Sequence, residues 1–236
     1  MRHSLGRGLS IGDPPVERVH VRPSVLFLAA AVFSLGSAAA LAATDPHKEQ
    51  ERLRPADMTL ARRATIKAAD LLSGWKRMPV TSGEDSKCPG FDPDFSAYTI
   101  TGKASSLFAQ PGGGAVLSAV EVYKTRAQAI GDFRTGTKPA FAKCIRHAFE
   151  TEIARGTGGT AKTISSRMVP APGVGERSAL YRLVGTVTLQ GQTIRVYMDV
   201  LAFQRGRSIT ALLSTGFGGR IRGQTTLARV IAARMR

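Results

Sequence analysis

The chain has 236 residues and a net charge of +16, with only two cysteines and four histidines. Three of the histidines precede residue 48, so the folded part cannot supply the Cys and His ligands of a common zinc site, and we expect neither a metal nor a cofactor. The low cysteine count also excludes a disulfide-dense scaffold.

The positive charge is concentrated in the C-terminal part of the chain. Residues 44–100 hold nine basic and nine acidic side chains, whereas residues 101–236 hold twenty basic and six acidic ones. A field of this sign attracts anionic partners such as nucleic acid, cell-wall polymers or lipid headgroups. A solvated basic surface without a partner is the alternative interpretation.

Residues 1–42 have the pattern of an export signal. An apolar run over residues 25–43 follows two arginines and contains an Ala-Leu-Ala site at residues 40–42, which predicts cleavage after Ala42. An uncleaved membrane anchor is the alternative, because the run approaches the roughly 20 residues that span a bilayer. No cysteine follows the site, where Thr44 stands instead, so we expect a secreted or envelope protein without a lipid anchor.

The remaining 194 residues are enough for one domain with its own core. We expect residues 43–57 to be a flexible tether, since this stretch is charged and lacks periodic apolar residues, and residues 58–236 to be a single domain. From Thr59, which can cap a helix, apolar residues recur at helical spacing as far as Trp75. One helix with a buried face is therefore predicted here.

Cys88 and Cys144 both follow the export signal. An even cysteine count in an oxidising compartment indicates a disulfide, and two separate buried thiols are the alternative. Cys88 lies in a predicted loop over residues 79–94, which is rich in glycine, proline and acidic residues. The bridge would fix this loop to a predicted helix that carries Cys144.

The middle of the chain predicts two strands and then two helices. Loose alternation over residues 97–108 and a Val-, Leu- and Tyr-rich stretch over residues 115–124 flank three glycines, as in a pair of strands joined by a turn. Residues 126–153 have helical spacing that Gly136 and Pro139 interrupt. Proline suits the first turn of a second helix.

Three antiparallel strands are predicted over residues 178–217, with two-residue turns at Gln190-Gly191 and Arg205-Gly206. Both turns place the apolar side chains of the three strands on one common face. Agreement between two independent turns supports this register more strongly than one alternating strand would.

The opposite face of these strands holds the candidate ligand-binding residues, which are Arg182, Arg195, Tyr197 and Asp199. The register places Arg182 directly across from Asp199, so cationic, aromatic and acidic groups gather on one sheet face. An exposed cross-strand salt bridge, worth under about 1 kcal/mol, is the alternative interpretation.

An amphipathic helix is predicted over residues 225–236, at the end of the chain. The element order is then helix, strands, helix, strands, helix. Runs of antiparallel strands indicate an α+β fold, with helices covering one face of a curved antiparallel sheet.

Three further patterns suggest chemistry only superficially. Residues 156–163 read GTGGTAKT and nearly match a phosphate-binding loop, but that loop requires a preceding strand and a following helix, so we expect no nucleotide. His147 is the only histidine after residue 47 and has no nucleophile motif near it. Paired acids such as Asp92 and Asp94 suit turns. The chain is therefore predicted not to be an enzyme.

The segment ATIKAADLLSGW at residues 64–75 resembles the opening helix of secreted actinobacterial sensor-like proteins, as does GKASS at residues 102–106. In size and element order the chain is similar to the extracellular domains of PknH-type mycobacterial kinases and related lipoproteins. The resemblance implies a helix-flanked antiparallel sheet with a cleft for an unknown ligand. Those domains carry more cysteines, and no functional residue transfers from them.

These observations predict an exported ligand-binding or sensor-like module without catalytic activity. The first alternative is a basic protein that binds anionic cell-wall polymers or nucleic acid by electrostatics alone. The second alternative is an extracellular hydrolase. A focused cleft would favour the ligand-binding module, a broad arginine-covered surface the electrostatic binder, and converging acids the hydrolase.

Overall fold

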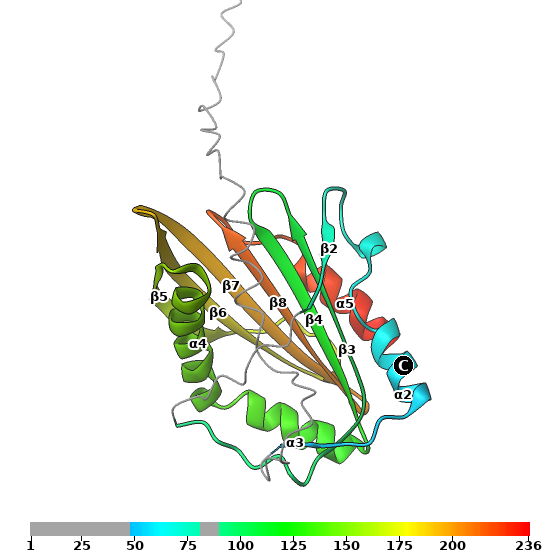
Figure 1. Cartoon of the computed structure of the whole chain (residues 1–236). Coiled ribbons are helices and arrows are strands. Elements are labelled where there is room, and N and C mark those ends of the chain that lie inside the picture. The colour runs from blue at the N-terminus through cyan, green and yellow to red at the C-terminus, as the bar shows by residue number, and fades with distance from the viewer. Residues whose placement is uncertain (1–47, 81–89) are drawn as a thin grey trace, which may run out of the picture.

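The computed structural model describes residues 48–80 and 90–236 (Figure 1). Its strands are β1 (Gln50–Glu51), β2 (Lys76–Met78), β3 (Thr99–Gln110), β4 (Gly114–Tyr123), β5 (Thr160–Val169), β6 (Arg177–Leu189), β7 (Gln192–Arg205) and β8 (Ser208–Phe217). Its helices are α2 (Pro55–Arg63), α3 (Arg126–Gly136), α4 (Pro139–Thr157) and α5 (Gln224–Arg234), with a 3-10 turn at Ala68–Asp70. The predicted export signal and Cys88 lie outside the described residues.

All eight strands form one sheet in the order β1-β3-β4-β8-β7-β6-β5, with β2 paired to β3. Every pairing is antiparallel except that of β1 with β3. The fold is therefore a mixture of helices with a large, mainly antiparallel sheet, as predicted. Within the described residues, no helix combines the length and the apolar character needed to cross a membrane.

The folded domain begins earlier than residue 58. β1 pairs with β3, and α2 begins at Pro55, so the end of the expected tether belongs to the fold. Pro55 suits the first position of a helix because its missing N–H needs no partner there. Thr59 does not cap the helix, since its hydroxyl donates to Pro55 O at 3.0 Å.

The predicted single helix up to Trp75 is wrong, because α2 ends at Arg63 and a 3-10 turn and β2 follow. Buried hydroxyls of the sheet bind the chain where it leaves the helix. Ile66 N–H donates to Ser118 Oγ at 3.0 Å, and Ile66 O accepts from Ser106 Oγ at 3.0 Å. These contacts between distant residues bury Ile66 and outweigh local helical spacing.

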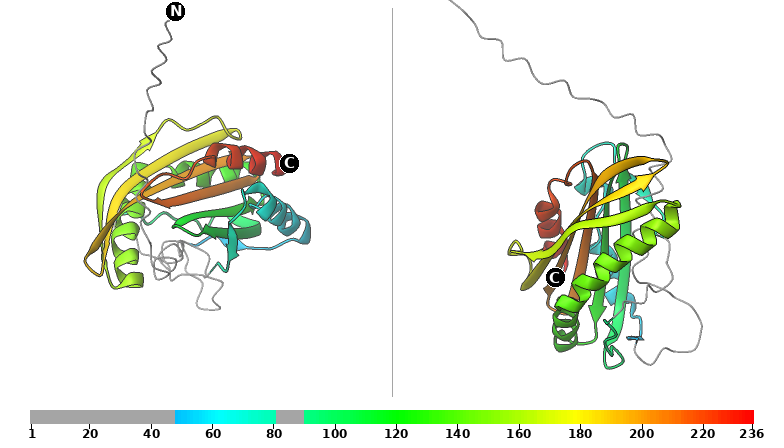
Figure 2. Two further views of the ribbon diagram at one scale, coloured as in Figure 1. Left: turned by 90° about the horizontal axis from the view of Figure 1, so that it is seen from above. Right: turned by 90° about the vertical axis from the view of Figure 1, so that its left-hand side faces the viewer.

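Helices cover both faces of the sheet, which corrects the prediction of one covered face. Neighbouring residues of β3 belong to different cores: Phe108 lies in the core that contains Leu227 of α5, and Leu107 in the core that contains Phe149 of α4. Figures 1 and 2 show α5 and α4 on opposite sides of the sheet. Alternating side chains of β3 thus serve two cores.

Glycine lets a helix approach the sheet closely on each face. A Cβ atom at Gly102 of β3 would lie 2.3 Å from Asp57 O of α2, and one at Gly185 of β6 would lie 2.5 Å from the ring of Phe149. Real Cβ atoms cannot tolerate such distances. The two glycines therefore fix how tightly α2 and α4 pack.

The predicted hairpins are confirmed with one adjustment. The β6–β7 turn lies at Gln190-Gly191, where both residues have positive φ of 49° and 79°, as a type I′ turn requires. The β7–β8 turn lies at Gly206-Arg207, because Arg205 pairs with Ser208. The register therefore moves by two residues, and because a strand repeats every two residues the side chains keep their predicted faces.

β5 forms one edge of the sheet, and β1 and β2 lie at the other. A register irregularity between Thr163 and Ser165 bulges β5 at Ile164. The GTGGTAKT segment runs from the last two residues of α4 into the first residues of β5. That helix-to-strand order is the reverse of a phosphate-binding loop.

Candidate functional site

The β6–β7 hairpin brings together two of the four predicted ligand-binding residues. Arg182 of β6 is the direct partner of Asp199 of β7. Its guanidinium donates from Nε to Asp199 Oδ1 and from Nη2 to Asp199 Oδ2, both at 3.1 Å. This bidentate pairing is stronger and more specific than a single hydrogen bond between neutral groups. The predicted juxtaposition of Arg182 and Asp199 is therefore confirmed.

A second arginine joins the pair from the loop after β8. Arg220 Nη1 also donates to Asp199 Oδ1, and the Arg220 guanidinium carbon lies 5.3 Å from the centroid of the Tyr197 ring. That distance is within the range of a cation–π contact. Sequence reasoning missed Arg220, because no periodic pattern places a residue of a glycine-rich loop. Its only sequence signal was an arginine directly after Gly218-Gly219.

The Asp199 carboxylate is buried while its two arginine partners remain partly exposed. Asp199 is 8% exposed, and the side chains of Arg182 and Arg220 are 35% and 32% exposed. Gln224, the first residue of α5, donates to Asp199 O at 3.0 Å and so holds the strand below the cluster. Because two guanidinium groups share one carboxylate, one positive charge is left uncompensated.

Two exposed arginines flank this cluster on the same face. Arg195 lies two residues from Tyr197 on β7, and Arg167 of β5 is the direct partner of Arg182. Within the described part of the chain, neither side chain makes a hydrogen bond or an ion pair. Arg195, although one of the four predicted site residues, thus lies beside the contacts of Arg182, Asp199 and Arg220 without taking part in them. The arginine face, as used below, comprises Arg167, Arg182, Arg195, Tyr197, Asp199 and Arg220.

The arginine face lies on the α5 side of the sheet, next to the start of that helix. Asp199 pairs with Ser214, and Ser214 pairs with Val116, which packs in the same core as α5. Directly paired residues of antiparallel strands share a face. The predicted site therefore lies on the same face of the sheet as α5, beside the first residue of that helix.

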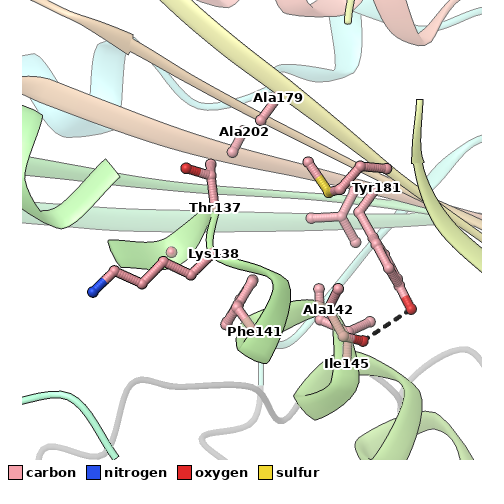
Figure 3. A pocket seen from close by; sticks show the side chains of 11 residues that line it. Thr137, Lys138, Phe141, Ala142, Ile145, Ala179, Tyr181 and Ala202 are labelled. Carbon is pink, nitrogen blue, oxygen red and sulfur yellow. Dashed lines mark hydrogen bonds between the residues drawn. The ribbon is translucent and has the colours of Figure 1, made fainter. Parts of the chain in front are cut away.

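A pocket lies on the opposite face of the sheet, between the junction of α3 with α4 and strands β5, β6 and β7 (Figure 3). Its empty volume is about 290 Å³, part of which is open solvent. Its walls are mainly apolar, as with Phe141 and Ile145. Its Tyr181 hydroxyl already donates to Ala142 O at 3.0 Å, and its Thr137 hydroxyl to Phe133 O at 2.9 Å. No residue of the arginine face lines it.

The predicted disulfide is described only in part. Cys144 lies buried on α4 and is not a free cysteine. Cys88 lies outside the described residues, so the pairing of Cys88 with Cys144 stays a prediction. His147 lies on the same helix, and no group of three His, Cys, Asp or Glu residues in the described ranges is placed to hold a metal ion.

Comparison with known proteins finds no matching family model and no matching curated protein. Among solved structures, the extracellular domain of PknH from Mycobacterium tuberculosis matches with 13% identity and a TM-score of 0.32, over 58% of this chain and 64% of that domain. LpqN, involved in cell envelope biogenesis of Mycobacterium tuberculosis, matches with 11% identity and a TM-score of 0.28, over 70% and 76%.

These matches confirm the weak resemblance to PknH-type extracellular domains and related mycobacterial proteins that the sequence indicated. The chain spans less than two thirds of the PknH domain. At TM-scores of 0.32 and 0.28 the likeness carries no argument about ligand, site or mechanism.

Proposed function

We propose that this protein is an exported, non-enzymatic module that binds an anionic component of the cell envelope at the arginine face. The observation that carries the proposal is the sharing of the buried Asp199 carboxylate by Arg182 and Arg220. A guanidinium has five N–H donors in a fixed fork. The carboxylate occupies only part of each fork and orients the rest, so an incoming anion meets donors whose positions are already set.

The flanking arginines extend this anchored pair into a broader surface. Arg167 and Arg195 are exposed, and neither is held by an acidic side chain in the described part of the chain. Phosphate and carboxylate groups bind arginine bidentately, and Tyr197 offers a ring face on which a sugar or a further cation can rest. The chemistry favours a ligand with more than one anionic group.

The exposure of Arg167 and Arg195 on the arginine face favours an extended ligand. The pocket of Figure 3 lies on the other side of the sheet, and its hydroxyls are engaged in internal hydrogen bonds. A small anion on an open surface competes with water for every donor. A polymer or a lipid surface with many anionic groups gains from several contacts at once.

Binding of polyphosphate and of phosphatidylglycerol vesicles, with phosphatidylcholine vesicles as the neutral control, tests this proposal. The double variant Arg167→Ala/Arg195→Ala should bind the anionic probes at least about tenfold more weakly, because each bond from a charged donor contributes about 1.5 to 3 kcal/mol. Arg134→Ala/Arg229→Ala, which removes the same charge from exposed positions on α3 and α5, is the matched control and should change binding less than twofold.

Equal weakening by both double variants would contradict the proposed site and favour the diffuse electrostatic binder. In that alternative, binding results from the excess of basic side chains in residues 101–236, which hold twenty basic and six acidic ones. It predicts that duplex DNA binds as well as polyphosphate and that affinity falls steeply with salt, because phosphate binding releases counterions. Absence of binding to every anionic probe would remove both functions.

A further inference from the structure

Carboxyl side chains from β4, from α3 and from the residue before β1 gather at the β7–β8 turn end of the sheet. The hydroxyl of Tyr123 lies 2.9 Å from Glu121 Oε2 and 2.8 Å from Asp132 Oδ2. Tyr123 is fully buried. Glu49, directly before β1, interacts electrostatically with Glu121, Asp132 and Tyr123. These four residues are called the carboxyl cluster.

The geometry around Tyr123 favours a proton beyond the one that the phenol carries. A phenol has one O–H to donate, and ionised carboxylates can only accept. Two ionised carboxylates would have to share that single O–H, whereas both contacts of Tyr123 can be well-aligned hydrogen bonds when Glu121 or Asp132 is protonated and donates to the phenol oxygen. The cluster is therefore better satisfied when it holds a carboxylic acid.

The raised pKa values of the carboxyl groups mean that this proton is lost near neutral pH. Burial, followed by the charge of Asp132, raises the pKa of Glu121 to about 7. Burial, followed by the charge of Glu121, raises the pKa of Glu49 to about 7. Burial also raises the pKa of Asp132 to about 6, although the hydrogen bond from Tyr123 opposes this increase.

Other charged groups facing the cluster do not neutralise it. Lys103 of β3 lowers the pKa of Glu121 but is already paired with Glu51 of β1. Glu51 itself adds to the negative field on Glu121 and Glu49. Lys48 lowers the pKa of Glu49 only as the smallest of five contributions.

β1 is held to the sheet weakly enough for this cluster to control it. It is a two-residue strand, held by its short ladder with β3, by the Lys103–Glu51 ion pair and by the Gln50 side chain. Three further backbone hydrogen bonds attach the segment around it. Gln50 N–H donates to Tyr98 O at 2.9 Å, Arg52 N–H to Ile100 O at 2.9 Å and Arg54 N–H to Thr101 O at 2.7 Å. Short, peripheral elements of this kind open locally without global unfolding.

We propose that the carboxyl cluster is a proton-operated clasp, which holds β1 on β3 while a carboxyl is protonated and releases β1 when the carboxyls ionise. Ionisation places like charges on Glu49, Glu121 and Asp132. Moving Glu49 away with β1 relieves the repulsion and also exposes this side chain to water. Opening uncovers the backbone of β3 along its first residues.

The direction of the pH effect follows from the raised pKa values. A carboxyl whose pKa is raised in the closed state binds its proton more tightly there, so low pH favours closure. The clasp is therefore strongest below the ordinary carboxyl pKa of 4.5 and weakens as pH rises through about 7.

Hydrogen exchange of the amides in and directly after β1 of the full chain tests the clasp. After correction for intrinsic exchange, protection of the Gln50, Arg52 and Arg54 amides should fall at least about tenfold between pH 5.5 and pH 8, since each unit of pKa shift corresponds to a tenfold change in an equilibrium constant. Amides of β7 should stay more strongly protected than those of β1 at every pH, which separates local opening from global unfolding.

Glu49→Gln and Glu121→Gln should each reduce this pH dependence to less than about threefold, because an amide cannot ionise. Asp92→Asn, at an exposed carboxyl, is the matched control and should retain the full effect. Glu49→Gln lies outside the sheet core, so it remains informative if Glu121→Gln fails to fold. Protection of β1 that does not depend on pH, or an unchanged slope in Glu49→Gln, would overturn the proposal.

Discussion

Half-way along the β6–β7 hairpin, arginines gather around one carboxylate, and at the β7–β8 turn end of the sheet carboxyls gather around one phenol. In the arginine region, Arg182 and Arg220 are partly exposed, so water and salt screen their excess charge. In the carboxyl region, Tyr123 is buried, and burial, followed by repulsion between the carboxyls, raises the pKa of Glu121 instead. One sheet thus tolerates like charges by exposure in one region and by protonation in the other.

Reduction of the predicted disulfide should have the largest effect on stability. It should leave the difference between the arginines around Asp199 and the carboxyl cluster unchanged. Loss of a Cys88–Cys144 bridge is expected to lower the free energy of unfolding by about 4 kcal/mol on the chain-entropy model, as measured by urea denaturation. No charge changes in either region, so the pH dependence of stability should persist. Thiol labelling of the denatured, unreduced protein should find no free thiol. Two labelled thiols per chain would disprove the bridge.

Removal of the shared carboxylate should be the next largest effect. Asp199→Ala leaves Arg182 and Arg220 facing one another without an anion, and urea denaturation should show a loss of about 2 to 3 kcal/mol. Loss of one partner of a fully buried pair costs more, but these arginines are about a third exposed. Asp92→Ala, at an exposed position, should change stability by less than about 0.5 kcal/mol. Equal losses of stability in Asp199→Ala and Asp92→Ala would show that an aspartate shared by two arginines contributes no more than an isolated one.

Unfolding measured over a series of pH values should show the contribution of the carboxyl cluster to stability separately from that of the arginines. Because the folded chain raises the pKa of Glu49 and Glu121 to about 7, folding takes up protons and stability falls as pH rises from 4.5 through 7. We expect a loss of about 1 to 2 kcal/mol between pH 5 and pH 8, reduced from the full linkage value by solvent screening. Unfolding midpoints that rise over this interval would contradict the raised pKa values.

Replacement of the aromatic ring in the arginine region should have the smallest effect on stability. Tyr197→Leu removes the cation–π contact with Arg220 and should cost about 0.5 to 1 kcal/mol, the range for partly exposed pairs. Thermal unfolding at low and high salt measures this contribution. Tyr98→Leu, which removes a ring packed against Tyr123, is the comparison in the carboxyl region and should cost more, since it opens a buried contact. A larger loss for Tyr197→Leu would reverse the comparison.

The hairpin region was predictable because local chemistry determines it. Turn residues and two-residue alternation were enough to place Arg182 opposite Asp199. Even the misplaced β7–β8 turn left each side chain on its predicted face, since the error was an even number of residues. Arg220 was not predictable from such rules, because its position depends on how a loop with two glycines returns over β7.

The end of the first helix and the packing of helices on both faces of the sheet were not predictable. The reason differs from that for Arg220. The helix ends where Ser106 and Ser118, far away in sequence, bind the backbone of Ile66. The second covered face depends on β3 and β4, whose residues are buried on both sides. Likewise, the carboxyl cluster joins Glu49 to Glu121 and Asp132 through the pairing of β1, which was expected to be tether. Long-range contacts decide all three features.

The bulge in β5 has a consequence for how the protein behaves at high concentration. An edge strand offers unpaired backbone groups to any other chain with an extended segment, and Ile164 and Met168 are 53% and 43% exposed there. The bulge at Ile164 breaks the regular spacing that a second strand would need, and the exposed charges of Lys162 and Arg167 repel an identical strand. The edge is thus protected against fibril-like stacking.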